Sequence, residues 1–345
     1  MTNLNISLDI ATIIQPFLLA FFAFALSMVI TPLYTTLAYK HEWWKKARTN
    51  AVTGEKATMY QKLHAQKHLR NIPTMAGIIF VLTTLLITIV ANLSRSDTWL
   101  PLAAMVGAGC IGLVDDILNI RGFGGGIAGM RASLKSWLIF VVAAIGGWWF
   151  YAKLDISSIH VPFLGSLTLG ILIIPLFIFV VIACANAVNI SDGLDGLAGG
   201  LSVSAFSAYA IIAMLEGRYG VAGFCLTIVG ALLSYTWFNI FPARFFMGDV
   251  GSFALGTALG VVAMLTDTVL ILPVIALVFV TEAGSSLLQI MSKRFRHGKK
   301  IFKIAPIHHH FEASGWPETK VTMRFWIVGQ IAAVVGILLY LLGRT

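Results

Sequence analysis

The chain has 345 residues, of which 58% are hydrophobic and only 11% are charged, and its formal net charge is +9 at pH 7. A soluble protein carries about 25% charged residues, so this composition excludes an ordinary soluble protein and indicates an integral membrane protein. The 24 Lys and Arg residues stand in a few short stretches between apolar runs, which is the pattern that sets membrane topology and gives no support to a nucleic-acid partner.

Apolar runs recur along the whole chain. A spanning helix needs roughly 17 to 25 mostly apolar residues, and this length predicts an all-α polytopic membrane protein with about ten transmembrane helices, in a single domain over residues 1–345. We expect Pro175 and Pro273 to mark positions where a helix can kink, and a small hairpin around 152–161. The predicted spans are 11–36, 72–94, 98–114, 134–151, 162–186, 197–215, 219–241, 252–266, 268–291 and 324–342.

The distribution of basic residues predicts the orientation of these spans in the membrane. An even number of spans places both termini on one side, and if that side is the outside, 20 of the 24 Lys and Arg face inward. Only Arg95, Lys153, Arg218 and Arg344 remain outside. Nearly every polar cluster then lies in the inside loops, which predicts an active-site cleft on the cytoplasmic face. These loops are 37–71, 115–133, 187–196, 242–251 and 292–323.

Two carboxylates, Asp115 and Asp116, stand at the inner end of the third span. Adjacent helical residues point about 100° apart, so the two need not share one proton. One could contact a metal or a phosphate while the other serves as a base; the alternative is a charge pair at a helix end.

The inner end of the fifth span continues as an unusually polar, glycine-rich loop, 186–200. Its glycines allow a close approach of the backbone to a ligand, and Asp192 and Asp195 share a face if the loop is helical. An ordinary turn with a helix cap would need one Asp rather than two. Nucleotide or sugar recognition therefore fits the loop better.

Asp249 stands just before the eighth span, where a helix start attracts anions such as phosphate. Phosphate chemistry recruits Mg²⁺ through one or two carboxylates together with the oxygens of the substrate. A plain helix cap is the alternative function for this residue.

The last inside loop contains His308, His309 and His310. Consecutive side chains do not easily converge on one zinc ion, and no Cys lies nearby, so phosphate hydrogen bonding suits them better. Glu282, inside the ninth span, is costly in lipid and is expected to face protein or a cavity near Gln289.

Five strings of the sequence together resemble the polyprenyl-phosphate N-acetylhexosamine-1-phosphate transferase superfamily. Within it, the triple histidine followed by Phe311-Glu312 favours the bacterial phospho-N-acetylmuramoyl-pentapeptide transferase (translocase I) branch. Leu69 stands where that family has a lysine, which leaves Lys67 or Arg70 to supply the cation. The matching strings are Pro73-Thr74-Met75, Val114-Asp115-Asp116, the loop 186–200, the segment 246–252 and the loop 306–318.

The resemblance implies transfer of phospho-MurNAc-pentapeptide from UDP-MurNAc-pentapeptide to undecaprenyl phosphate, giving lipid I and UMP for peptidoglycan synthesis and cell wall biogenesis. It also implies Mg²⁺ dependence, a multi-pass location in the bacterial cytoplasmic (inner) membrane, and periplasmic termini. A homodimer is left open. By motif, Asp249 would be the magnesium ligand, and Asp115, Asp116 and His308 would be catalytic with it. The substrate contacts would be Thr74, Asn189, Asp192, Asp195, Asn239, Phe246, Gly248, Gln289 and His309.

Direct attack by the lipid phosphate and a covalent route through Asp115 or Asp116 both fit these residues. Two other functions are consistent with part of the pattern. A polyprenyl-phosphate GlcNAc-1-phosphate transferase would use UDP-GlcNAc instead. A membrane transporter also carries intramembrane carboxylates, but the acids here cluster at the inner ends of spans, without an inverted repeat.

Overall fold

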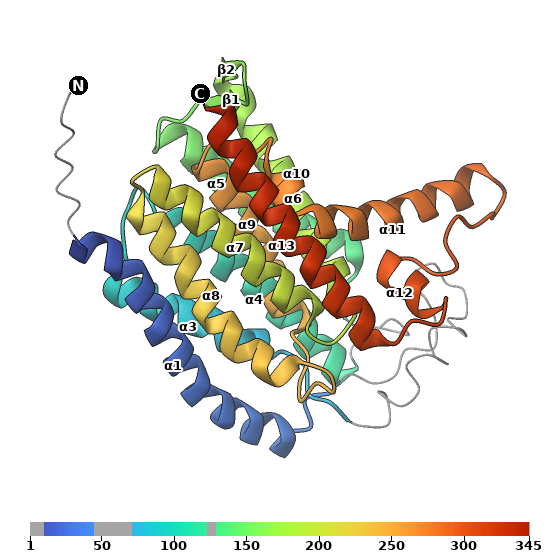
Figure 1. Ribbon diagram of the computed structural model, residues 1–345. Helices are drawn as coiled ribbons and strands as arrows, with labels where there is room; N and C mark the ends of the chain where they lie inside the picture. Colours follow the sequence, from blue (N-terminus) through green and yellow to red (C-terminus); the bar gives the residue numbers. More distant parts are fainter. Residues whose placement is uncertain (1–9, 45–70, 123–128, 345) are drawn as a thin grey trace, which may run out of the picture.

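The computed structural model describes residues 10–44, 71–122 and 129–344, and this part of the chain is a bundle of helices with one short hairpin (Figure 1). The helices are α1 (Ile10–Lys40), α3 (Gly77–Ala91), α4 (Trp99–Arg121), α5 (Ala132–Ala152), α6 (Ile173–Ser191), α7 (Leu197–Leu215), α8 (Tyr219–Asn239), α9 (Gly248–Leu265), α10 (Leu272–Ile275), α11 (Leu277–Phe295), α12 (Ile307–Glu312) and α13 (Glu318–Gly343). The hairpin pairs β1 (Ser158–Val161) with β2 (Gly165–Thr168) in antiparallel register.

Eight helices in the described residues are long and apolar enough to cross a membrane. The prediction of an all-α polytopic membrane protein is therefore confirmed. The two remaining predicted spans correspond to α3, which has only 15 residues, and to the α10–α11 segment.

Helix α9 forms the centre of the bundle. Nearly every residue from Gly248 to Leu265 is buried, as expected for a helix that is apolar all round. It packs against α3, α4, α6 and α7. Asp249, in the first turn of this central helix, is therefore surrounded by the ends of several other helices.

Glycines let α9 approach its neighbours closely. A Cβ added at Gly112 of α4 would overlap the carbonyl group of Asp249, and one added at Gly256 would overlap Cys184 and Ala185 of α6. Absent side chains at such positions allow helix backbones to pack in direct contact. The contact at Gly112 fixes the position of Asp249 relative to the end of α4.

The predicted span 72–94 is helical only from Gly77 to Ala91. Before it, the backbone is not helical and pairs with the segment that precedes α9. Phe246 N donates to Pro73 O at 2.8 Å, Ala76 N donates to Phe246 O at 3.0 Å and Gly77 N donates to Met247 O at 2.9 Å. A proline at position 73 disfavours a helix in the residue before it, so this stretch forms part of the site instead of crossing the membrane.

The hairpin predicted around 152–161 is present but extends further, because β2 occupies residues that we had assigned to the span 162–186. Helix α6 begins only at Ile173, so Pro175 lies in its first turn and does not kink it. The ninth predicted span, 268–291, is also interrupted, at Ala276 between α10 and α11, while Pro273 lies at the start of α10. Figure 1 shows α11 running away from the bundle, and Leu287 and Phe295 on it are exposed.

Candidate active site

Three helices bring opposite charges together at one end of the bundle. The Nζ atom of Lys135, on α5, lies 2.7 Å from Asp115 Oδ2 of α4 and 2.5 Å from Asp249 Oδ2 of α9. Asp115 also accepts hydrogen bonds from Met130 N at 2.6 Å and Asn119 Nδ2 at 3.1 Å. The lysine therefore holds two carboxylates from separate helices side by side, and we call Asp115, Asp116, Asp249 and Lys135 the acidic centre.

Asp116 is completely buried and faces the start of α9, where its Oδ2 accepts a hydrogen bond from Val250 N at 3.1 Å. Gly248 precedes this contact with a φ of 75°, and a Cβ there would overlap Asp116 Oδ2 and come within 3.0 Å of Thr74 Oγ1. Only glycine fits this position, because the backbone is left-handed and the space is already filled. Thr74, Asp116 and Gly248 are thus brought together, as the sequence suggested for residues of one site.

Asn189 extends the acidic centre toward the loop between α6 and α7. Its Nδ2 donates to Ser252 Oγ at 2.8 Å and lies 3.4 Å from Asp249 Oδ1. Asp192, at the end of α6, is half-buried in the same loop. Asn189 thus places its side-chain amide beside Asp249, and Asp192 follows three residues later.

Asp195 and Asn239 hold this loop in place. Asp195 Oδ2 accepts from Ala243 N at 3.0 Å, and Asn239 Oδ1 accepts from Gly196 N at 2.9 Å. Asn239 Nδ2 also donates to Phe245 O at 2.8 Å, next to the half-buried Phe246. Three of the expected substrate contacts, Asp195, Asn239 and Phe246, thus lie together, and the side chains of Asp195 and Asn239 bind backbone groups in this structure.

The consecutive histidines have different surroundings. His308 Nδ1 lies 2.7 Å from Glu282 Oε2, with both side chains almost fully buried, and His309 Nδ1 lies 2.7 Å from Glu312 Oε2. His310 instead accepts a hydrogen bond from Lys303 N at 3.1 Å. Because each ring has its own partner, the three histidines do not converge on one metal ion.

The histidines and the acidic centre lie at the same end of the bundle. A Cβ added at Gly193 would overlap His308 Nε2, so the ring of His308 touches the α6–α7 loop. Gly193 follows Asn189, which contacts Asp249, by four residues, and four residues reach at most about 14 Å. The segment from Asn189 to Gly193 therefore connects the acidic centre to His308.

Gln289 occupies a supporting position. Its Oε1 accepts from Ile301 N at 2.9 Å and Phe302 N at 3.0 Å, and its Nε2 donates to Phe302 O at 2.9 Å. The side chain holds the segment that leads to α12. Its expected contact with substrate stays a prediction.

Lys67 and Arg70, the two candidates for the family lysine, lie outside the described residues. In the sequence, Lys135 counted only as one of the basic residues that set the membrane orientation. A cation inside the predicted span 134–151 is nevertheless costly, and this cost indicates a carboxylate partner. Glu282 was expected to face protein or a cavity near Gln289, and it faces protein, with His308 of α12 as its partner.

The donors of the acidic centre suit a hard cation. Carboxylate oxygens from α4 and α9 lie together with an asparagine side chain, and Mg²⁺ needs only one or two protein carboxylates when substrate phosphates complete its shell. Among the described residues there is no group of three or more His, Cys, Asp or Glu side chains that could hold a metal ion by itself. The acidic centre therefore offers oxygen donors of the kind that Mg²⁺ prefers, with Lys135 Nζ between Asp115 and Asp249 in this structure.

A mostly apolar cavity of about 330 Å³ lies beside the acidic centre. Leu113 and Ile117, which lie on either side of the two aspartates on α4, are part of its lining. The other lining residues are Trp43, Met75, Ile78, Ile120 and Arg121. The cavity offers apolar surface within one helical turn of Asp116.

Comparison with known proteins gives a consistent result. The sequence model of Glycosyl transferase family 4 matches residues 98–267, which include the whole acidic centre but not the three histidines of the loop 306–318, which we call the histidine loop. Over nearly the whole chain, the sequence is similar to proteins named phospho-N-acetylmuramoyl-pentapeptide-transferase. The one from Chloroflexus aurantiacus (strain ATCC 29366 / DSM 635 / J-10-fl) is 38% identical over 340 residues, covering 94% of this chain and 89% of the relative.

Two further relatives of that name show the same extent of similarity. The Clostridium novyi protein is 37% identical over 319 residues, covering 92% of this chain and 94% of the relative. The Staphylococcus carnosus protein is 35% identical over 328 residues, covering 93% and 98%. The matched part of this chain includes both the acidic centre and the histidine loop. Because the identity and the coverage are this high, the chain belongs to the phospho-N-acetylmuramoyl-pentapeptide-transferase family.

Proposed function

We propose that this protein transfers phospho-MurNAc-pentapeptide from UDP-MurNAc-pentapeptide to undecaprenyl phosphate, forming lipid I and releasing UMP in bacterial peptidoglycan synthesis. The observation that carries the proposal is the convergence of Asp115 and Asp249 on Lys135, with Asp116 against the start of α9 and His308 at the same end of the bundle. The similarity to full-length relatives supports the choice of substrates.

The proposal includes ten membrane crossings, with α3 and the α10–α11 segment joining the eight longer helices. It places the protein in the bacterial inner membrane with both termini periplasmic and the acidic centre facing the cytoplasm. The distribution of basic residues supports this orientation. The four cations predicted to lie outside, Arg95, Lys153, Arg218 and Arg344, are at the end of the bundle opposite the acidic centre. A soluble nucleotide donor can then enter from the cytosol while the lipid acceptor arrives within the membrane.

Catalysis in this site depends on positioning and charge. Asp249, with Asn189 beside it, would hold Mg²⁺ against the diphosphate of the donor. When bound, the ion would supply charge stabilisation for the departing UMP. His308, whose orientation is fixed by Glu282, would donate a hydrogen bond to a phosphate oxygen, and Lys135 would keep Asp115 and Asp249 in place as the anions approach.

The acceptor requires both an apolar surface and a charged site. The cavity lined by Leu113 and Ile117 would take part of the isoprenoid chain next to Asp116. One of Asp115 and Asp116 would take the proton of the lipid phosphate or orient it for direct attack. If a phosphorylated aspartate that turns over competently is trapped in Asp115→Asn or Asp116→Asn protein, the covalent route replaces direct attack.

Release of UMP by the purified protein tests the function. With undecaprenyl phosphate and Mg²⁺, we expect UMP from UDP-MurNAc-pentapeptide and none from UDP-GlcNAc. The opposite preference would make the protein a GlcNAc-1-phosphate transferase. Release of UMP in detergent solution, without sealed vesicles, separates both enzymes from a transporter.

A further inference from the structure

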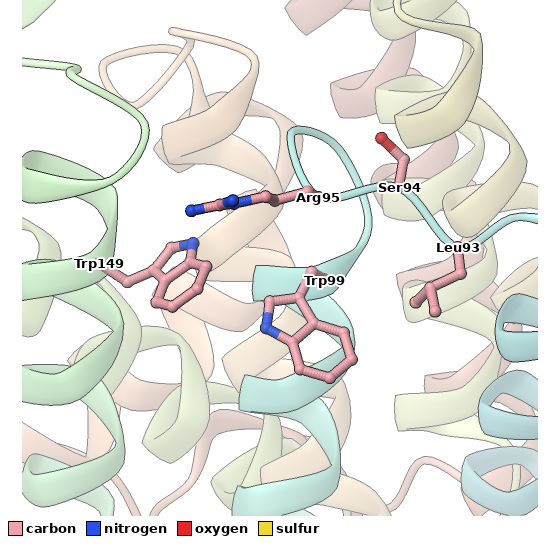
Figure 2. A pocket seen from close by; sticks show the side chains of 5 residues that line it. All are labelled: Leu93, Ser94, Arg95, Trp99 and Trp149. Atoms are coloured by element: carbon pink, nitrogen blue, oxygen red, sulfur yellow. The ribbon is translucent and has the colours of Figure 1, made fainter.

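The end of the bundle opposite the acidic centre contains a cavity of about 460 Å³ between the α3–α4 loop and α5 (Figure 2). Its lining consists of Leu93, Ser94, Arg95, Trp99 and Trp149. We propose that this cavity binds one anionic phospholipid, with the lipid phosphate on Arg95 and an acyl chain along Leu93 and the two indole rings. The proposal is independent of the transferase activity and requires only that the bundle spans a membrane.

Tryptophans place the cavity at a membrane surface. Trp99 begins α4, and Trp148 and Trp149 lie in the last turn of α5, so the three indoles mark one level of the bundle. Trp99 and Trp148 are exposed at 45% and 51%. Trp is enriched at membrane–water boundaries because its ring is apolar and its N–H is polar. A ligand at this level meets both acyl chains and headgroups.

At this end of the bundle, two described cations form ion pairs with carboxylates and two others can bind an external anion. Arg218 pairs with Asp97 at 2.9 Å, and Arg344 pairs with Glu216 at 2.7 Å. Arg95 lies over the ring of Trp149, with Cζ 5.9 Å from the centroid, and Lys153 lies over Trp148. Within the described part of the chain, no carboxylate pairs with either of these two cations. The guanidinium of Arg95 lines the cavity and can form two parallel hydrogen bonds to a phosphate.

Trp149 adds a second polar group. Its Nε1 is buried and has no hydrogen-bond partner, which is unusual for a buried indole. Figure 2 shows this nitrogen facing the Arg95 side chain and the Trp99 nitrogen facing the Trp149 side of the cavity. A phosphate oxygen or a headgroup hydroxyl on Arg95 would give the Trp149 N–H the acceptor that the protein itself does not provide.

The loop that carries Arg95 is held before any ligand binds. Thr98 Oγ1 accepts from Ser94 N at 2.7 Å and donates to Asn92 O at 2.7 Å, and Asn92 Nδ2 donates to Gly220 O at 2.9 Å on α8. Binding therefore costs little ordering of the backbone. This rigidity distinguishes a formed site from a cation on a mobile tail.

Native mass spectrometry of the delipidated, full-length protein in detergent tests the proposal. The probes are phosphatidylglycerol and phosphatidylcholine with identical acyl chains. We expect the first phosphatidylglycerol to bind more tightly than the first phosphatidylcholine. Arg95→Gln should weaken it about tenfold, since hydrogen bonds to charged groups are worth about 1.5–3 kcal/mol. Trp149→Phe, which keeps a ring under Arg95 but removes the N–H, should weaken it by about threefold.

Lys153→Gln is the matched control, because it removes one positive charge from the same level without lining the cavity. We expect it to change the affinity less than twofold. Equal losses in the Arg95 and Lys153 variants would overturn the proposal in favour of diffuse attraction to the surface. Equal binding of the two lipids, or displacement of phosphatidylglycerol by millimolar glycerol phosphate, would also overturn it. Unchanged UMP release in each variant shows that the protein is folded.

Discussion

Glu282 is the residue whose replacement tests the histidine part of the site most directly. Its Oε2 lies 2.7 Å from His308 Nδ1, and the side chains are 0% and 1% exposed. Glu282→Gln keeps the size and an acceptor but removes the charge, which changes a charged hydrogen bond of about 1.5–3 kcal/mol into a neutral one of about 0.5–1.5 kcal/mol. The difference corresponds to about a tenfold fall in kcat/KM.

A larger change should give a larger loss. Glu282→Ala leaves the buried Nδ1 of His308 without its partner, which costs about 1–3 kcal/mol and should lower kcat/KM by about 100-fold at the upper limit. The assay is UMP release from UDP-MurNAc-pentapeptide, measured together with thermal unfolding in the same detergent. Because Glu282 acts through His308, its replacement in a His308→Ala background should have almost no further effect.

Glu216→Gln provides the control for loss of a buried carboxylate. Glu216 pairs with Arg344 at 2.7 Å at the other end of the bundle, and its side chain is 8% exposed. We expect this variant to keep its activity within about twofold while losing comparable thermal stability. The reasoning is refuted if Glu282→Gln lowers activity equally with and without His308, or if Glu216→Gln lowers it to the same extent.

Three further outcomes follow from the packing and charge of the site. Lys135→Met should lower UMP release by about 100-fold, because Asp115 and Asp249 lose the ammonium group between them, and Lys135→Arg should retain more activity in the same assay. Gly112→Ala should destabilise the protein by about 1–3 kcal/mol in thermal unfolding, because the added methyl group would overlap the backbone of α9. The control is Gly107→Ala on the same helix, whose methyl group would meet its nearest atom at 3.4 Å and should cost less than about 0.5 kcal/mol. Chelation with EDTA should abolish UMP release and added Mg²⁺ should restore it; activity that persists in EDTA would contradict the assignment of Asp249 as a magnesium ligand.

Much of the fold could be predicted because transmembrane helices have a local cause. A run of apolar residues must satisfy its backbone hydrogen bonds internally once it leaves water, so composition and length alone locate a helix. This explains why the eight long helices were anticipated. The same rule failed at 72–76, which form a non-helical segment, and at 162–172, which form part of a hairpin and a short 3₁₀ turn. Pairing with other parts of the chain satisfies the backbone there, and that pairing leaves no local pattern.

Some residues of the candidate site could be identified from the sequence, and others only from the tertiary structure. Asp116, Gly248 and Thr74 were named from their motifs, and the structure brings them into contact. Lys135 received no role from the sequence, since its meaning depends on Asp249, which lies 114 residues away. Glu282 was recognised as a costly charge, but the sequence did not identify His308 as its partner.

The sequence by itself determined that the protein lies in a membrane, where most of its helices run, and which short motifs carry its polar chemistry. Each of these depends on the transfer of apolar groups out of water or on residue types within a few positions of one another. Only the tertiary structure decided that α4, α5 and α9 share one lysine, that His308 rests on Glu282, and that α11 leaves the bundle. Such contacts depend on how closely helices distant in sequence can pack, and glycines such as Gly112 set that distance only when the partner helix is present.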